Sequence, residues 1–255
     1  DEGSATRGAL EIAAEAESLG AYISTYSDLD TSTVSLSALK VQLEPSLDLF
    51  AEVVKEPAFP EDELIRLRKR WIEGIRQEKN EPVQLALRTL PVLMYGDGHA
   101  YGIPFTGSGT EESINSLKRD DLIAWHQTWI RPSNGTLFVV GDTTMDEILP
   151  LLNQYFGSWA ENRMAVPEKN IAEVAMRPGG VYLIDKPGAP QSLILAGHVA
   201  PPTGVDNNID ILTMNDVIGG SFTARVNMNL REDKGWAYGA YTFMEDARGQ
   251  RPWLV

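Results

Sequence analysis

Apolar residues recur at intervals of three or four positions in several stretches of the chain, which is the period of one helix face. The first stretch predicts a helix that is capped by Ser4 or Thr6 and ends at Gly20, because short polar side chains favour the start of a helix and glycine its end. The same spacing predicts further helices over residues 45–55, 61–80, 83–94, 119–129, 145–156, 207–219 and 222–232.

Other stretches alternate between apolar and polar positions or are continuously apolar, and these patterns predict strands. Residues 21–39 alternate on both sides of a polar turn at residues 27–30, which is typical of an antiparallel hairpin. Further strands are predicted at 135–142, twice within 179–202, at 238–243 and at the apolar end of the chain.

The order of these elements predicts an α+β fold made of two-layer units, each with a sheet and covering helices. The first predicted unit covers residues 1–160 and the second covers 179–255, with a linker at 161–178. The second unit is expected to be incomplete, since the sequence ends on entering a strand and begins without methionine. No line-by-line sequence repeat links the two units.

Composition excludes several classes of function. The net charge of -14 argues against nucleic-acid binding, which needs a basic surface. The absence of cysteine excludes disulfides and thiolate zinc sites, and no apolar run is long enough to predict a membrane span.

The three histidines, His99, His126 and His198, lie far apart in the sequence and belong to no H-x-x-E-H or H-E-x-x-H pattern. We expect His99 to organise a glycine-rich loop, His126 to lie partly buried on a helix, and His198 to end a strand. The chain therefore contains no self-sufficient catalytic or metal site that spacing alone could identify.

One stretch, "MNLREDKGWAYGAYTF" (residues 228–243), brings an arginine and a tyrosine near a helix-to-strand turn. Arg231 would lie near the helix end and Tyr238 at the strand start, with the chain turning at Gly235. Arginine and tyrosine donors could together hold a peptide carbonyl or stabilise an oxyanion. Simple packing, with Arg231 at a helix C-terminus and Tyr238 on a sheet, explains the spacing equally well.

The segment "IGGSFTARVNMNLREDKGWAYGAY" (residues 218–241) resembles the signature of the metal-free half of the insulinase/pitrilysin family of inverse zincins, with the same interval of seven between arginine and tyrosine. "RGALEIAAEAESLGAYISTYSDLDTSTVSLSAL", "FPEDELIRLRKRWIEGIRQE", "YGDGHAYGIPFTGS" and "RPSNGTLFVVGD" are also similar to that family, in its order, and together cover most of the 255 residues.

The resemblance implies the fold of the mitochondrial-processing-peptidase-like metallohydrolases, two similar α+β units. In active members an H-x-x-E-H helix and a distal glutamate bind zinc, and the motif glutamate acts as base on the metal-bound water. A metal-free half closes over the peptide and supplies its arginine and tyrosine.

By this resemblance, the H-x-x-E-H motif would fall just before Asp1, and Glu73 lies near the distal-ligand position. Arg231 and Tyr238 match the substrate-assisting pair. The preferred hypothesis is a half or subunit that is inactive on its own and binds no metal, with peptide substrates and a zinc-bearing H-x-x-E-H partner, as in a heterodimer.

Two alternatives remain open: an active zinc metalloendopeptidase whose H-x-x-E-H lies upstream of Asp1, and a structural assembly subunit without proteolysis. Similar bacterial sequences are often exported, so the periplasm is favoured over the cytoplasm.

Overall fold

The computed structural model describes residues 2–159, 165–176 and 178–255. Its chain forms two compact units, one made of Asp1–Glu73 with Thr110–Glu168 and the other of Gly74–Gly109 with Lys169–Val255. This grouping places the glycine-rich loop with the C-terminal residues. The predicted division, which follows sequence order with a linker at 161–178, stays a prediction; residues 160–164 and 177 of that region lie outside the described residues.

The first unit consists of a hairpin and several helices. Its elements are α1 (Ala9–Leu19), β1 (Tyr22–Ser27), β2 (Ser32–Ser37), η1 (Lys40–Gln42), α2 (Leu43–Lys55), the first part of α3 (Glu61–Glu78), α5 (Glu111–Ser116), α6 (Arg119–Trp129), η2 (Pro132–Asn134) and α7 (Met145–Phe156). The predicted hairpin is confirmed, with β1 and β2 antiparallel and Ile23 opposite Leu36.

Helix α1 ends as predicted but begins differently. Gly20 has φ of 62° at the C-cap, a left-handed conformation that glycine adopts without steric cost. The N-cap is Gly8, whose backbone N–H donates to the Glu11 carboxylate. The predicted caps at Ser4 and Thr6 are wrong, because both side chains instead donate hydrogen bonds to Glu52 on α2.

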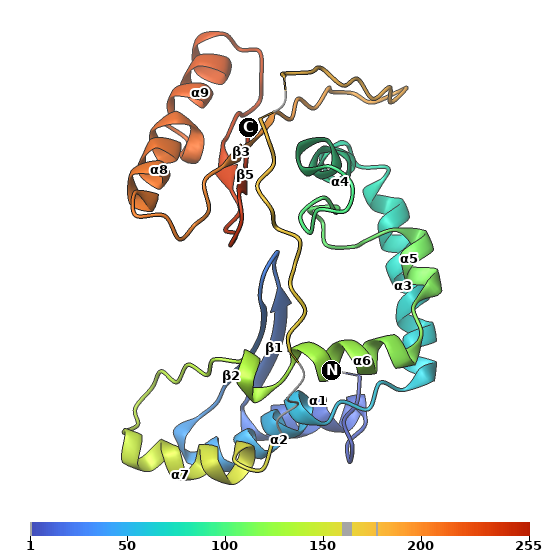
Figure 1. The fold of residues 1–255 in the computed structure, drawn as a ribbon, viewed down its shortest axis with the longest axis vertical. Helices are drawn as coiled ribbons and strands as arrows, with labels where there is room; N and C mark the ends of the chain where they lie inside the picture. The colour runs from blue at the N-terminus through green and yellow to red at the C-terminus, as the bar shows by residue number, and fades with distance from the viewer. Residues whose placement is uncertain (1, 160–164, 177) are drawn as a thin grey trace. The chain divides into compact units, whose positions relative to one another are not determined.

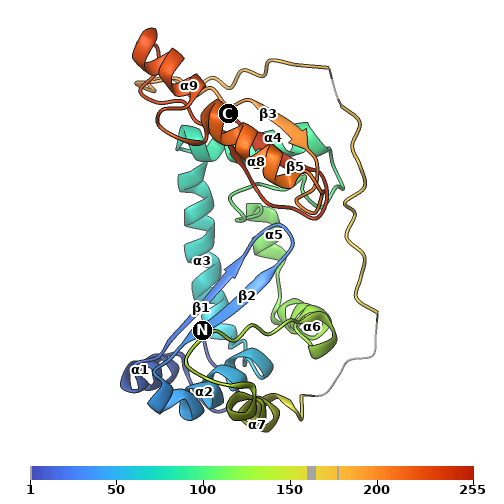
Figure 2. The same ribbon diagram turned by 90° about the vertical axis from the view of Figure 1, so that its left-hand side faces the viewer.

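Helix α2 supplies the core of this unit. Its buried residues include Leu47, Leu49 and Phe50, and Phe50 meets Phe156 of α7 edge to face at a centroid distance of 6.1 Å. Burying one such side chain contributes about 1.5–3 kcal/mol. Figure 2 shows the hairpin β1–β2 projecting away from the helices α1 and α2 at its base.

The second unit contains a small sheet and two groups of helices. Its elements are the last part of α3, α4 (Pro82–Tyr95), β3 (Gly197–Ala200), α8 (Asn208–Asn215), η3 (Asp216–Gly220), α9 (Arg225–Asn227), η4 (Met228–Asp233), β4 (Phe243–Met244) and β5 (Arg251–Leu254). The strand order is β3-β5-β4, with both pairs antiparallel.

Helices cover the two faces of this sheet, with α8 and α4 on opposite sides of β3 and β5 (Figure 1). On one side the Trp253 indole N–H donates to the Asn215 side chain of α8 at 2.8 Å. On the other, β3 approaches α4 closely at Gly197, where an added Cβ would stand 2.7 Å from Leu90. The sheet is thus the middle layer of an α+β unit.

Three predicted strands are corrected by the structure. Residues 135–142 and 181–185 contain no strand, and the strand expected at 238–243 is reduced to Phe243–Met244. Val140 and Val181 are each 98% exposed. A strand needs a hydrogen-bonding neighbour, and none pairs with the first two segments within the described residues. Apolar content alone therefore predicted strands that the tertiary structure does not form.

Across the described part of the chain, no helix is long and apolar enough to cross a membrane.

Candidate functional site

The candidate site is built on a helical segment that contains an unusual turn. Helix α9 continues directly into η4, whose Met228–Asp233 have π-helical hydrogen bonding. A second π-helical segment, η3, precedes it at Asp216–Gly220. Such π-turns widen the helix and often occur at functional sites. Arg231 lies near the end of η4, as predicted from the sequence.

A tight turn brings the chain back over this helix end. Gly235 has φ of 62°, and its N–H donates to the Arg231 carbonyl at 3.1 Å. The Trp236 N–H donates to the Leu230 carbonyl at 2.9 Å. The predicted turn at Gly235 is therefore confirmed, and it carries the following residues back toward Arg231.

Arg231 and Tyr238 meet at this turn. The Arg231 guanidinium lies 5.5 Å from the centre of the Tyr238 ring and 4.7 Å from that of Phe222. Its Nε also lies 3.4 Å from the carboxylate of its neighbour Glu232. Aromatic rings attract a cation through their quadrupole, so the two rings hold the guanidinium without neutralising its charge.

Both side chains remain open to a ligand. The Arg231 side chain is 33% exposed, and Tyr238 is 88% exposed. Tyr238 is not the first residue of a strand, as the sequence suggested, because β4 begins only at Phe243. The exposed phenol and the guanidinium donors together could bind a carbonyl or a carboxylate.

Asn227 fixes the base of this arrangement. It is fully buried, and its side-chain amide donates to the Phe222 carbonyl at 2.7 Å and accepts from the Ala240 N–H at 3.1 Å. One amide thus ties Phe222, three residues before α9 begins, to Ala240, two residues after Tyr238. Sequence reasoning missed both Asn227 and Phe222, because their role depends on contacts rather than on spacing.

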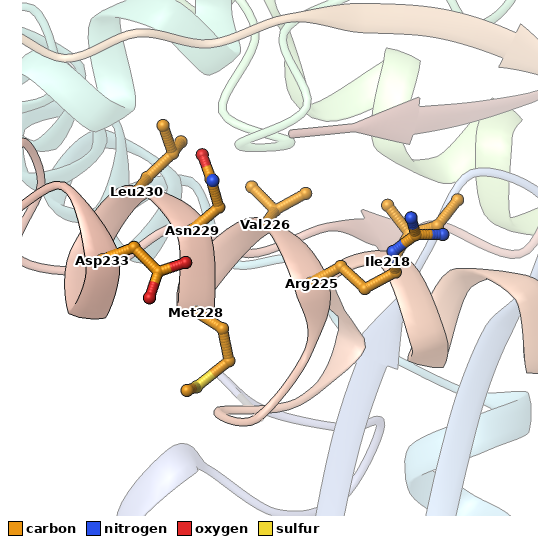
Figure 3. Close-up of a pocket in the computed structure, with 7 residues that line it drawn as sticks. All are labelled: Ile218, Arg225, Val226, Met228, Asn229, Leu230 and Asp233. Atoms are coloured by element: carbon orange, nitrogen blue, oxygen red, sulfur yellow. The ribbon is translucent and has the colours of Figure 1, made fainter.

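An open groove of about 740 Å³ lies along the same helical segment (Figure 3). All seven side chains that line it come from η3, α9 and η4. Four are apolar and one is Asn229, while Arg225 and Asp233 lie at opposite ends of the labelled set in Figure 3. Sequence analysis did not single out either charged residue.

The histidines do not form a metal site. His99 accepts the Tyr101 N–H at Nδ1 and has Nε2 at 3.2 Å from the Ala172 carbonyl, so both ring nitrogens are engaged and the expected loop-organising role is confirmed. His126 has Nε2 at 2.8 Å from the Val54 carbonyl, and His198 lies in β3. Residues 2–159, 165–176 and 178–255 contain no group of three or more metal-ligating side chains, so they do not fit a zinc centre.

Glu73, the candidate distal ligand, lies on α3 and is exposed. Its proposed relation to a zinc ion stays a prediction, since any H-x-x-E-H motif lies outside this sequence.

The most strongly perturbed titratable groups are not residues of the candidate site, and they serve structural roles. Burial alone would raise the pKa of Glu52, but hydrogen bonds from Ser4 and Thr6 and the charge of Arg7 outweigh it and lower the pKa to about 2. The hydrogen bond to Glu15 is the main cause of the raised pKa of Arg7, and Asp48 and Glu52 add to it.

Burial also raises the pKa of Tyr95, whose hydroxyl donates to the Gln250 carbonyl at 2.9 Å. The Tyr95 ring stacks on His99 at a centroid distance of 4.8 Å and meets Tyr101 edge to face. This cluster is closed and tightly hydrogen-bonded, which is the behaviour of a core rather than of a binding surface.

Family models match nearly the whole chain. The model described as "Peptidase M16 inactive domain" matches residues 116–255, and the model described as "Insulinase (Peptidase family M16)" matches residues 2–101. The first of these covers more than half of the sequence. The chain belongs to the insulinase family, peptidase family M16. The resemblance seen in the sequence is therefore confirmed.

Individual M16 proteins agree with this assignment. The chain is 25% identical over 245 residues to the "Uncharacterized zinc protease YmxG" of Bacillus subtilis, covering 94% of this chain and 57% of that protein. A crystal structure of a peptidase M16 inactive domain from Pseudomonas fluorescens matches with a TM-score of 0.81 and 24% identity, covering 99% of this chain and 60% of that one.

A protease structure from Helicobacter pylori matches with a TM-score of 0.89 and 19% identity, covering 99% of this chain and 61% of that one. The predicted fold class is thus confirmed: α+β units of the M16 type. The chain spans little more than half the length of the M16 proteins it matches. The part of the chain at residues 116–255 is the one that matches the M16 inactive domain.

Proposed function

We propose that this chain is the metal-free half or subunit of an M16 zinc peptidase and that it contacts the peptide through Arg231 and Tyr238. The observation that carries the proposal is the placement of the Arg231 guanidinium 5.5 Å from the Tyr238 ring, with both side chains accessible. The match to the M16 inactive domain over residues 116–255 supports it.

Zinc would be held by a partner half that carries H-x-x-E-H, separate or in the same polypeptide. This chain would close a peptide-degrading chamber with that half, which would separate the peptide from bulk solvent while leaving the catalytic water at the scissile carbonyl. Zinc in that half would polarise the scissile carbonyl, and donors from this chain that are already in place would stabilise the negative charge developing on the carbonyl oxygen without reorganising. The Arg231 guanidinium and the Tyr238 hydroxyl would supply such donors from this chain.

The ring contacts give Arg231 a specific advantage for this role. A guanidinium held by carboxylates would lose much of its attraction for an oxyanion, whereas one held by aromatic rings keeps its full charge. Its nearest carboxylate, Glu232, lies on the adjacent residue at 3.4 Å and is 44% exposed, so solvent screens it.

The test is reconstitution of the full-length protein with its zinc-bearing partner or half, followed by a fluorogenic peptide assay. We expect cleavage only when the H-x-x-E-H half is present, and a tenfold to thousandfold lower kcat with Tyr238→Phe, the range for losing one oxyanion donor. Tyr182→Phe, at another exposed tyrosine of the same unit, is the matched control and should leave kcat unchanged.

A second candidate is an active zinc metalloendopeptidase, and the description of YmxG as a zinc protease favours it. Robust zinc-dependent cleavage that requires an H-x-x-E-H motif in the residues just before Asp1, with no second M16 half present, would establish this candidate and exclude the metal-free half. A stable assembly whose peptidase activity is indifferent to Arg231 and Tyr238 would instead indicate a structural subunit.

A further inference from the structure

The groove along α9 and η4 carries two charged side chains, Arg225 and Asp233, that have no ion-pair partner in the described part of the chain. Arg225 begins α9, is exposed, and forms neither an ion pair nor a side-chain hydrogen bond with any described residue. Asp233 ends η4, is exposed, and is likewise without an ion pair in the described part of the chain. Each is therefore available to a ligand of opposite charge.

The surface between these charges is apolar except for Asn229, which lies midway between them along the helix. Ile218, Val226, Met228 and Leu230 line it, and Met228 is 39% exposed. An apolar side chain of a ligand placed here would bury its own surface and that of the lining. Each Å² of apolar surface removed from water would favour binding by about 25 cal/mol. The lining therefore combines apolar side chains with a cation toward one end and an anion at the other, and in Figure 3 Val226 and Leu230 point to one side of the helix while Met228 points to the other.

The separation of the charges sets the length of a matching ligand. Arg225 and Asp233 are eight residues apart on one continuous helical segment, and an α-helical rise of 1.5 Å per residue puts their backbones at most about 12 Å apart along the axis, because the wider π-helical turns of η4 advance less per residue. An extended peptide advances about 3.3 Å per residue, so about 12 Å corresponds to three or four residues.

We propose that this groove is a specificity subsite for an extended peptide segment that carries an acidic and a basic side chain three or four residues apart with an apolar side chain between them. The acidic group pairs with Arg225, the basic group with Asp233, and the apolar group contacts Val226 and Leu230. The subsite rests on the proposed function, in which the peptide lies beside Arg231 of the same segment.

The test measures peptide binding rather than cleavage, so that its outcome is separate from that of the kcat assay. Three fluorescently labelled peptides with blocked ends are compared: Glu-Ala-Leu-Ala-Lys, Lys-Ala-Leu-Ala-Lys and Glu-Ala-Leu-Ala-Glu. Their Kd values for the full-length protein in its assembly are obtained by fluorescence anisotropy. We expect the mixed-charge peptide to bind about two- to fivefold more tightly than the other two, as partly exposed ion pairs allow.

Two charge-reversing variants sharpen the result. Arg225→Glu should make the two-lysine peptide the tightest ligand, and Asp233→Lys should make the two-glutamate peptide the tightest. Asp206→Lys, at an exposed acidic residue that does not line the groove, should keep the wild-type order. If the charge reversals disturb folding, the uncharged variants Arg225→Gln and Asp233→Asn replace them in the test. Each should abolish the preference for the mixed-charge peptide.

Equal affinity of the three peptides for the wild type, absence of binding, or an unchanged order in Arg225→Glu would overturn the subsite. Loss of kcat in Tyr238→Phe together with equal peptide affinities would leave the proposed function standing and exclude only the subsite. Unchanged kcat in Tyr238→Phe together with the expected order of affinities would exclude the catalytic role of Arg231 and Tyr238 and leave the subsite standing.

Discussion

Arg7 in the first unit and Arg231 in the second are both partly covered arginines, but their charges are held in different ways. Arg7 is 21% exposed and forms ion pairs with Glu15, Asp48 and Glu52. Arg231 is 33% exposed and lies over the rings of Phe222 and Tyr238, and among the described residues Glu232, its neighbour, is its one ion-pair partner.

The comparison separates a structural arginine from one that can act on a ligand. Three carboxylates neutralise Arg7 and tie the N-terminal segment to α2. The positive charge of Arg7 is therefore not available to a ligand. Aromatic rings fix the position of Arg231 while leaving its positive charge available. Burial alone does not distinguish the two; the chemistry of the neighbours does.

The largest expected effect is on catalysis by the assembled enzyme. Arg231→Ala should lower kcat about tenfold to a thousandfold, because a preorganised donor to the transition state is lost. Its melting temperature should stay near that of the wild type, since no buried ion pair is broken. Steady-state kinetics and a thermal melt of the same sample check both expectations.

Arg231→Lys is the matched control, since it keeps the charge but removes the planar fork of donors. It should recover only part of the lost kcat. If Arg231→Ala instead lowers the melting temperature by as much as an Arg7 variant does, the contrast between the two arginines is wrong.

The next effect is on stability in the first unit. Arg7→Ala should lower the free energy of unfolding by about 2 kcal/mol, because it leaves Glu52, whose side chain is 12% exposed, without its ionic partner. Urea unfolding measures this change. The kcat of the folded enzyme should be unaffected, and a selective loss of kcat without a stability change would contradict the structural role.

A pH dependence follows from Glu52. Its folded-state pKa of about 2 lies below the ordinary value of 4.5, so its ionised form stabilises the fold above pH 4.5. That contribution should fall progressively as the pH drops from about 5 toward 2. In Glu52→Gln this portion of the acid dependence should be absent, which unfolding measurements at several pH values would reveal; identical pH profiles for the two proteins would argue against the ionic anchor.

The smallest effect tests the rings beside Arg231. Phe222→Leu removes one ring but keeps an apolar side chain, and should lower kcat about two- to fivefold, which corresponds to a cation–π contact of 0.5–1 kcal/mol at a partly exposed site. Kinetics at saturating peptide would show it. Phe243→Leu, at an exposed phenylalanine without a ring contact to Arg231, provides the comparison and should leave kcat unchanged.

Much of the helical structure could be predicted from the sequence, because helix formation depends on neighbours within one or two turns. The predicted helix at 119–129 corresponds to α6, and that at 145–156 to α7. The turn at Gly235 was also predictable, since a positive φ favours glycine. The family resemblance further identified Arg231 and Tyr238 as a pair by their spacing.

The tertiary structure decided what depends on distant partners. Residues 135–142 have the composition of a buried strand, but without a paired neighbour among the described residues they form none. Ser4 and Thr6 have the chemistry of helix caps, yet the Glu52 carboxylate on α2 takes both of their hydroxyl hydrogen bonds.

The same holds for the candidate site. From the sequence alone, Arg231 and Tyr238 could be placed on either side of a turn at Gly235. Only the fold placed Phe222 over Arg231 and used buried Asn227 to fix the loop. It also left Arg225 and Asp233 along one groove without an ion-pair partner in residues 2–159, 165–176 and 178–255. Local propensity acts through the backbone of adjacent residues, whereas a binding surface is made of side chains whose neighbours are chosen by packing.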